Sequence, residues 1–324
     1  MRRMIRKLGL PRKWLAYRTG RVVVPTNPDR LYVESTNQCN LACIMCPKGL
    51  GEMTRPVGRM DRALFRSIVD EMAPRVETAV LHIWGEPLLH PALGEMIRYC
   101  RQRGMRTEIS TNALELTEEK SREILESGLT TIYLCMDGTS SEEYRKIRRG
   151  GDYEKTRNNI LRFVEMRRKN GRNNPTVHLQ MIEMNLTADR ISAFQQQWRM
   201  DGVDRVHIKA FDTWAGQIGK VKNLSSDRDR PLPPRFPCPN LWYHVHIYWD
   251  GTLVCCDRDY DARYPLGNVA GGVMRAWNGE AMVELRRKHC SGDLNDVPSC
   301  GRCTEWNWWR PRLFSSRGNS PEDR

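Results

Sequence analysis

Two hydrophobic spacings alternate along most of the chain. Short apolar runs rich in β-branched and aromatic residues, typical of strands, are separated by longer runs with apolar residues at helical spacing. The strand-like runs span residues 31–35, 78–84, 106–111, 131–137, 176–182 and 205–210. The helical runs span residues 62–72, 91–103, 118–126, 153–169 and 188–198. Strands that alternate with helices predict a parallel sheet with helical crossovers, whose site lies at the carboxyl ends of the strands.

The alternation ends near Trp214, and a polar, proline-rich stretch over 223–236 predicts a linker. Beyond it, Asp250-Gly251 lies between two apolar runs, which predicts a hairpin with a two-residue I′ turn. We therefore expect five parts: a basic arm (1–30), the α/β unit (31–215), the linker (216–237), a cysteine-rich module (238–306) and a tail (307–324). Within the tail, we expect disorder from Ser315 onward.

Charge is uneven along the 324 residues, whose formal net charge is +13. The first 28 residues hold eight Lys and Arg and no acid. With apolar residues interleaved, this arm is predicted to contact an anionic membrane surface or an acidic partner, or to extend into solvent over the α/β unit. The chain has no apolar run of about 18 residues and no signal-peptide core, so we expect a cytoplasmic protein.

Eleven cysteines in a reduced compartment indicate metal or redox chemistry rather than disulfides. Cys39, Cys43 and Cys46 follow the first strand at Cys-x3-Cys-x2-Cys spacing. Three thiolates on one loop suit a soft metal centre, and an odd number leaves one coordination position for a reactant. Half of a zinc site, or three thiols close by chance, is the alternative.

This loop resembles the cluster loop of radical S-adenosylmethionine (SAM) enzymes. The resemblance implies that Cys39, Cys43 and Cys46 hold a [4Fe–4S] cluster whose fourth iron is chelated by SAM. Reductive cleavage of SAM then yields a 5′-deoxyadenosyl radical that abstracts hydrogen from the substrate. The resemblance also implies a partial (β/α)6 barrel and an electron donor of the flavodoxin or ferredoxin type.

Further matches follow the next strands. Trp84-Gly85-Glu86-Pro87 resembles the family's Gly-Gly-Glu-Pro motif, with Trp84 replacing the first glycine. Arg148 resembles an arginine that pairs with the SAM carboxylate, and Arg145 and Arg149 compete for this role. Strand alternation places Tyr133, Cys135 and Asp137 on one face of their strand. The resemblance implies the following contacts with SAM: Met45, Gly85, Glu86, Pro87, Ser110, Asn112, Cys135, Asp137 and Arg148.

A second set consists of Cys238, Cys256, Cys300 and Cys303, which suits either a closed zinc site or a fully ligated [4Fe–4S] cluster. Its spacing resembles the SPASM module in its shortened twitch form, which implies one auxiliary [4Fe–4S] cluster. We choose Cys256 over the adjacent Cys255 because it keeps the family's Gly-x4-Cys spacing.

The resemblance suggests three reactions. The first is oxidation of a carbohydrate or aminocyclitol alcohol, with the auxiliary cluster as electron acceptor. The second is epimerisation of a sugar, in which Cys135 returns hydrogen. The third is maturation of a ribosomally made peptide, which the short arm makes a weaker candidate. From another class, a zinc-bearing nucleic-acid binder is disfavoured because no nucleic-acid motif accompanies the basic residues.

Overall fold

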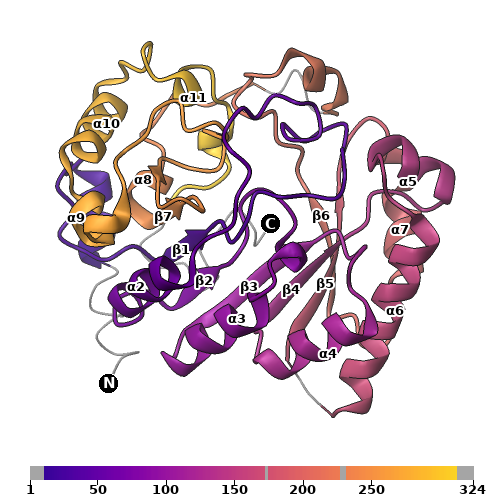
Figure 1. The fold of residues 1–324 in the computed structure, drawn as a ribbon. Coiled ribbons are helices and arrows are strands. Elements are labelled where there is room, and N and C mark those ends of the chain that lie inside the picture. The colour runs from indigo at the N-terminus through magenta and orange to yellow at the C-terminus, as the bar shows by residue number, and fades with distance from the viewer. Residues whose placement is uncertain (1–10, 172–173, 227–230, 312–324) are drawn as a thin grey trace.

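The computed structural model describes residues 11–171, 174–226 and 231–311, and one curved eight-stranded sheet organises them (Figure 1). Its strand order is β6-β5-β4-β3-β2-β1-β7-β8, and β1 to β6 are parallel neighbours in chain order. The first six strands are β1 (Arg30–Val33), β2 (Thr78–Val80), β3 (Arg106–Thr111), β4 (Thr131–Cys135), β5 (Thr176–Ile182) and β6 (Arg205–Lys209).

Crossovers between successive parallel neighbours, which are right-handed as a rule, place the connecting helices on one face, so the sheet curls into an open barrel. Figure 1 shows these helices along the outer side of the strands. The predicted partial (β/α)6 barrel is confirmed. The helices of this part are α2 (Arg62–Met72), α3 (Leu93–Gln102), α4 (Glu118–Ser127), α5 (Ser141–Ile147), α6 (Tyr153–Lys169) and α7 (Ile191–Gln197).

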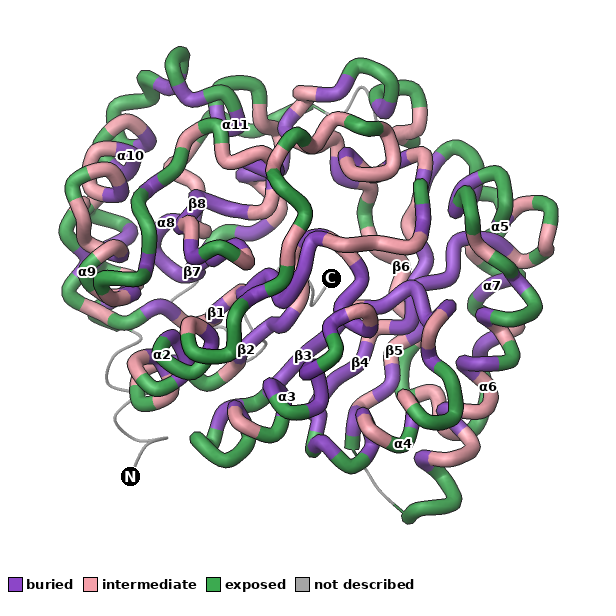
Figure 2. Tube along the Cα trace, viewed as in Figure 1, coloured by how far each residue is buried: buried purple, intermediate pink, exposed green. Residues whose placement is uncertain are grey.

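Capping residues set several of these helix ends. Asp61 accepts hydrogen bonds from the backbone N–H groups of the first turn of α2, and Thr117 does the same for α4. Gly128 ends α4 with φ +80°, a conformation that glycine adopts without a Cβ clash. Ile132 of β4 and Val177 of β5 are fully buried. Figure 2 shows that the central strands of the sheet are largely buried, whereas the helices around them carry many exposed residues.

The C-terminal module continues the same sheet. Strand β7 (His244–Ile247) pairs in parallel with β1, and β8 (Leu253–Val254) returns antiparallel to β7. Around this hairpin lie η4 (Val269–Gly271), α8 (Asn240–Tyr243), α9 (Val273–Trp277), α10 (Glu280–Ser291), α11 (Pro298–Gly301) and η5 (Glu305–Asn307). Because β7 extends the barrel sheet, the module and the barrel share one core.

Several local predictions differ from the structure. The predicted two-residue I′ turn is wrong, because Gly251 has φ +85° while Asp250 is absent from the residues with positive φ. Four strands end earlier than predicted: β1 at Val33, β2 at Val80, β4 at Cys135 and β6 at Lys209. The helix predicted over 188–198 is a short 3₁₀ turn, η2 (Ala188–Arg190), followed by α7, and the helix α5 was not predicted. A further 3₁₀ segment, η3 (Gly219–Leu224), lies in the predicted linker.

The described part of the basic arm packs against the module. The Tyr17 hydroxyl donates to the carbonyl oxygen of Pro237 at 2.8 Å, and Trp242 Nε1 donates to the carbonyl oxygen of Arg21 at 2.9 Å. Lys13 is buried and forms an ion pair with Asp29. Residues 1–10 and the predicted disordered end from residue 315 lie outside the described residues. Among the residues that are described, no helix is long and apolar enough to cross a membrane.

Candidate active site at the carboxyl ends of the strands

Cys39, Cys43 and Cys46 lie together on the loop that follows β1. Cys43 is buried in an apolar cluster with Leu41 and Met45, and Cys39 and Cys46 pack against the same cluster. The pKa of Cys39 is raised to about 11 and that of Cys43 to about 12, mainly by burial, and the negative charge of the neighbouring thiolates contributes to both shifts. The three thiols therefore share one desolvated site.

Backbone contacts fix this loop on two sides. Gln38 accepts a hydrogen bond at 2.6 Å from the backbone N–H of Glu86, beyond β2. Ala42 and Ile44 donate to the backbone oxygens of Arg149 and Ile147 at 2.9 and 3.0 Å, at the end of α5. The cysteine loop is therefore held between two of the segments that the sequence assigns to SAM.

The turn after β2 packs directly on the cysteine loop. Gly85 has φ +78°, and a Cβ at this position would lie 2.5 Å from the backbone oxygens of Thr36 and Gln38. The buried Glu86 carboxylate accepts hydrogen bonds at 2.7 Å from Thr111 Oγ1 and from the Asn112 backbone N–H. Burial raises the pKa of Glu86, while these donors oppose the shift. Glu86 therefore joins the ends of β2 and β3.

Asp137 and Arg148 form a buried ion pair beside the cysteines. Arg148 Nη2 lies 2.8 Å from Asp137 Oδ2, and Asp137 Oδ1 accepts from the Ile182 backbone N–H at 2.7 Å. Of the three candidate arginines, Arg148 is buried, whereas Arg145 and Arg149 are exposed. Arg148 also interacts electrostatically with Cys39, Cys43 and Cys46. It is thus the arginine that faces the cysteine site.

Cys135 lies on the inner wall of the barrel, two residues before Asp137. Its Sγ is 3.0 Å from Ser110 Oγ and 3.4 Å from Gln180 Nε2. Burial raises the pKa of Cys135, so the group remains a thiol at neutral pH. Ser110 and Cys135, which the sequence analysis predicts to contact SAM, are therefore direct neighbours in the structure. Asn112 lies near the cysteine loop, where its Nδ2 donates to Asn40 Oδ1 at 2.8 Å.

Deeper in the barrel the inner wall is polar. The ring of Tyr133 lies 4.7 Å from that of His178 and 6.4 Å from that of His207, measured between centroids. These three residues are only partly buried, while the intervening Ile132 and Leu179 are fully buried on the other face. Burial, with Arg205 and His207, lowers the pKa of His178 to about 4. His178 is therefore a neutral hydrogen-bonding group of this wall near pH 7.

The second cysteine set also comes together. Cys256 interacts electrostatically with Cys238, Cys300 and Cys303. Cys255 lies beside it, with its Sγ 4.0 Å from Cys256 Sγ and 3.6 Å from Ser299 Oγ. Cys255 also interacts with Cys300, so both thiols border this set, and Cys256 as the ligand stays a prediction.

Several residues that join the turn after β6 to the C-terminal module are not marked by the sequence. Arg258 Nη2 lies 2.6 Å from Asp212 Oδ2, and Glu305 Oε1 accepts hydrogen bonds from the backbone and hydroxyl of Thr213 at 2.9 and 2.5 Å. Glu305 also lies next to a cysteine, with its Oε2 3.3 Å from Cys303 Sγ. No sequence signal marks these pairs, because their members are separated by dozens of residues.

Both donor sets fit iron–sulfur clusters, since thiolates are the usual ligands of such clusters. Cys39, Cys43 and Cys46 would hold a cluster with one open iron, and Cys238, Cys256, Cys300 and Cys303 would hold a closed one. Within the described ranges, no three His, Cys, Asp or Glu side chains are arranged to hold a single metal ion. Each iron of a cluster takes its own thiolate, so ligands of a cluster stand further apart than ligands of one ion.

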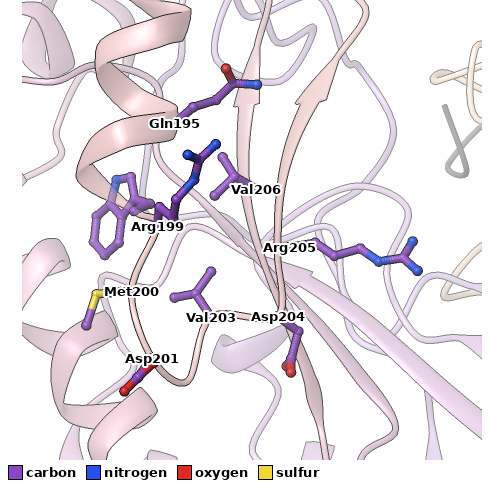
Figure 3. A pocket seen from close by; sticks show the side chains of 9 residues that line it. Gln195, Arg199, Met200, Asp201, Val203, Asp204, Arg205 and Val206 are labelled. Carbon is purple, nitrogen blue, oxygen red and sulfur yellow. The ribbon is translucent and has the colours of Figure 1, made fainter.

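A separate hollow of about 510 Å³ lies outside the barrel, between α7 and β6. Trp198, Met200 and Val206 are among its lining residues (Figure 3). In Figure 3, Arg205 and Val206 leave β6 on opposite sides, as strand alternation requires. The lining includes none of the cysteines or predicted SAM contacts, so this hollow is distinct from the candidate site.

Comparison with protein families places both cysteine sets in known domains. Residues 33–185 match the model of the radical SAM superfamily, and residues 238–304 match that of the SPASM iron–sulfur cluster-binding domain. The cofactor-modifying protein of the tungsten-containing aldehyde ferredoxin oxidoreductase of Pyrococcus furiosus is 32% identical over 158 residues, 47% of this chain and 43% of that protein. The chain thus spans less than half the length of the curated relatives it matches first.

Two solved structures share the fold over most of the chain. BtrN in complex with AdoMet and 2-DOIA has a TM-score of 0.56 at 16% identity, and the match covers 85% of this chain and 92% of BtrN. Streptococcus suis SuiB bound to the precursor peptide SuiA has a TM-score of 0.64 at 12% identity, covering 84% of this chain and 69% of SuiB. At these identities the likeness concerns the fold.

Proposed function

Because the chain belongs to the radical SAM superfamily and carries a SPASM domain, we propose that it dehydrogenates an alcohol of a carbohydrate or aminocyclitol. The radical SAM domain binds a [4Fe–4S] cluster and SAM, and the SPASM domain binds auxiliary iron–sulfur clusters. When bound and reduced, the first centre supplies the 5′-deoxyadenosyl radical that removes hydrogen from carbon. In this proposal Cys39, Cys43 and Cys46 hold that centre.

The inner wall of the barrel supports a small polar substrate. Tyr133, His178, Gln180, His207 and Lys209 lie on one side of β4 to β6, below the cysteine loop. Apart from Gln180, these side chains are partly accessible, and together they offer both hydrogen-bond donors and acceptors. A polyhydroxylated ring is the class of molecule that such a wall would bind and orient.

The single observation that supports oxidation is the electrostatic interaction between the segment that carries Cys256 and this wall. Asp257, next to Cys256, interacts electrostatically with His246 of β7 and Lys209 of β6. In this proposal the electron acceptor, held in part by the adjacent Cys256, lies on the side of the module that faces Lys209 of the wall. An alcohol oxidised by two electrons needs such an acceptor for the second electron, together with a group that takes the hydroxyl proton.

Epimerisation of a sugar is the second candidate, supported by the protonated Cys135 thiol on the inner wall. A thiol there could return a hydrogen atom to the opposite face of the substrate carbon. Peptide maturation is the third, and its support is the fold shared with SuiB, which was solved with a precursor peptide. Analysis of the product distinguishes the three reactions. A ketone supports oxidation, and an inverted carbon that has gained deuterium from the solvent supports epimerisation. A cross-link within a peptide supports maturation.

The deciding experiment is the iron content per chain, with EPR, after anaerobic reconstitution. The wild type should hold about 8 iron atoms, and the triple variant C39A/C43A/C46A about 4, as two four-iron clusters require. The variant C290A, which removes an exposed cysteine outside both sets, should keep about 8. About 4 iron falling to none in the triple variant, with zinc retained, would contradict auxiliary-cluster oxidation and make epimerisation the leading candidate.

A further inference from the structure

An exposed arginine lies directly beside the second cysteine set. Arg235 faces solvent, and its Nη2 donates to the backbone oxygen of Cys300 at 2.7 Å. Arg235 also interacts electrostatically with Cys238. A solvent-facing cation therefore borders two of the four residues that are predicted to hold the auxiliary cluster.

Two further exposed arginines extend this positive surface. The guanidinium of Arg310 lies over the ring of Phe236, 4.7 Å from its centroid, and Phe236 directly follows Arg235. The side chain of Tyr17 interacts electrostatically with both Arg310 and Arg18. Because Tyr17 belongs to the arm that packs on the module, the arm adds its own charge to this part of the surface (Figure 1). We call Arg18, Arg235 and Arg310 the arginine surface.

The charges of the arginine surface are not neutralised by ion pairs. In the part of the chain that the structure describes, no carboxylate lies within ion-pair distance of Arg18, Arg235 or Arg310. Instead, Arg18 lies 5.8 Å from the ring centroid of Trp14, and Arg235 lies 5.7 Å from that of Trp306. Arginines and aromatic rings are enriched where proteins bind one another. The surface thus combines a free positive charge with the composition of an interface.

The proposed oxidation creates a need for a partner at this place. An alcohol that becomes a ketone gives one hydrogen atom to the 5′-deoxyadenosyl radical, the hydroxyl proton to a base and one electron to the auxiliary side of the protein. A one-electron carrier must remove that electron before the next turnover, and the carrier is itself reduced by one electron. Such a carrier has to bind close to the auxiliary cysteines.

We propose that Arg18, Arg235 and Arg310 form the docking surface for an acidic one-electron carrier protein. Opposite charges on two proteins steer their encounter and orient the complex, which suits a partner that binds briefly and leaves. The place of the surface beside Cys238 and Cys300 favours a redox protein over other acidic partners. The proposal rests on the proposed function only for the direction in which the electron moves.

Binding of a strongly acidic bacterial flavodoxin to the reconstituted full-length protein tests this, by anaerobic titration calorimetry at low ionic strength. R18E/R310E reverses two charges and leaves the contact of Arg235 with Cys300 in place, so the dissociation constant should rise roughly 10-fold. In about 1 M salt, where the Debye length is about 3 Å, the wild type and this variant should bind equally weakly. The matched control is R98E/R199E, which reverses two exposed arginines on the outside of the barrel and should bind as the wild type does.

Electron transfer places the docking beside the auxiliary cysteines. In the C39A/C43A/C46A background only the auxiliary iron remains, and its reoxidation by oxidised flavodoxin can be followed by stopped-flow absorbance. Adding R18E/R310E should lower the second-order rate constant by roughly 10-fold or more, because electrostatic steering raises association rates by about 10- to 1,000-fold. Adding R98E/R199E should leave the rate constant unchanged.

The outcomes separate docking from other roles of these residues. Weaker binding and slower transfer in R18E/R310E alone support the proposal. Equal weakening in both double variants overturns it, because net charge would then act without a specific surface, and so does wild-type affinity in R18E/R310E. Binding of anionic lipid vesicles instead of flavodoxin, with the same dependence on Arg18 and Arg310, also overturns it.

Two controls keep this test decisive. If R18E/R310E holds less iron than the wild type, R18Q/R310Q replaces it; removing the charges without reversing them should raise the dissociation constant roughly 3-fold, and an unchanged constant would overturn the proposal. Failure of the proposed function is distinguishable, because an epimerised or peptide product leaves these binding and rate constants as they are.

Discussion

Gly85 is a residue whose lack of a side chain shapes the site. It combines φ +78° with backbone oxygens 2.5 Å from where a Cβ would lie, so Gly85→Ala adds a steric clash to an unfavourable conformation. We expect a loss of roughly 2–5 kcal/mol of stability, from about 1–2 for the left-handed backbone and about 1–3 for the overpacking. Thermal unfolding and iron content measure the effect, and iron should fall because the clash moves the cysteine loop.

Gly51 provides the control for this substitution. It has φ +74°, but a Cβ there would meet nothing within 4 Å. Gly51→Ala should therefore show the backbone effect alone, about 1–2 kcal/mol, and keep its iron. If the two variants lose the same stability and the same iron, the contact between Gly85 and the cysteine loop is not what makes glycine necessary.

His178 should be neutral throughout the physiological range. Burial is the largest cause of its lowered pKa of about 4, followed by repulsion from Arg205 and His207, while Asp204 opposes the shift. Its imidazole NMR signal, assigned by comparison with H178Q, should titrate near pH 4 rather than near 6.5. R205Q should move the midpoint upward by removing one positive charge, and a midpoint near 6.5 in the wild type would contradict a desolvated wall.

The sign of the linked stability effect follows from this shift. The folded state binds the proton on His178 less tightly than the unfolded state does, so protonation favours unfolding. The stability that this residue contributes is complete above about pH 6.5 and is lost as the pH falls towards about 4. The thermal midpoint of H178Q should accordingly depend less on pH within this window than that of the wild type.

At the scale of elements, the Asp137–Arg148 pair joins the end of β4 to the end of α5 and to β5. Removing the carboxylate in Asp137→Ala leaves a buried guanidinium unpaired, which we expect to destabilise the chain by about 3–5 kcal/mol. The double variant D137A/R148M should be less destabilised than D137A, because it removes the uncompensated charge as well. Thermal unfolding of the set tests this, and a double variant as unstable as the sum of the singles would refute the coupling.

The pattern of elements was largely predictable, and its errors have local causes. Regular spacing located β3, β5, α2 and α6 with the bounds that the structure gives. Helix α5 was missed because it is only seven residues long, although Ser140 caps it and accepts from the Glu143 backbone N–H. Ser140 and Glu143 have the spacing of a capping box, which is the signal that could have found this helix.

The candidate site was predictable where its residues follow strands, and not where it depends on contacts between distant segments. The cysteine loop, the turn at Gly85, and Cys135 all come at strand ends, so parallel topology brings them to one edge. Asp212, Arg258 and Glu305 carry no motif, and their contacts arise from the way the module docks on the barrel. Docking of this kind is set by tertiary packing, which spacing along the chain does not encode.

At the scale of the whole molecule, the barrel and the auxiliary module should unfold together. Strand β7 pairs with β1 through four residue pairs, from Arg30↔His244 to Val33↔Ile247. Glu71 of α2 accepts hydrogen bonds from the backbone N–H groups of Val273 and Met274 at 2.7 and 2.8 Å, at the start of α9. Because the two parts share the pairing of β1 with β7 and the contact of Glu71 with the start of α9, neither part has a complete hydrophobic core without the other.

Truncation tests this shared core. A chain ending at residue 237 loses the β7 partner of β1 and exposes the buried edge residues Leu31 and Val33, so it should lack a cooperative thermal transition by near-ultraviolet circular dichroism. A chain ending at residue 311 keeps every element of the described structure and should unfold in one transition at the wild-type midpoint. The opposite result would be that the chain ending at residue 237 unfolds cooperatively and retains the iron held by Cys39, Cys43 and Cys46. The barrel would then be an independent folding unit, to which the module adds no essential part of the core.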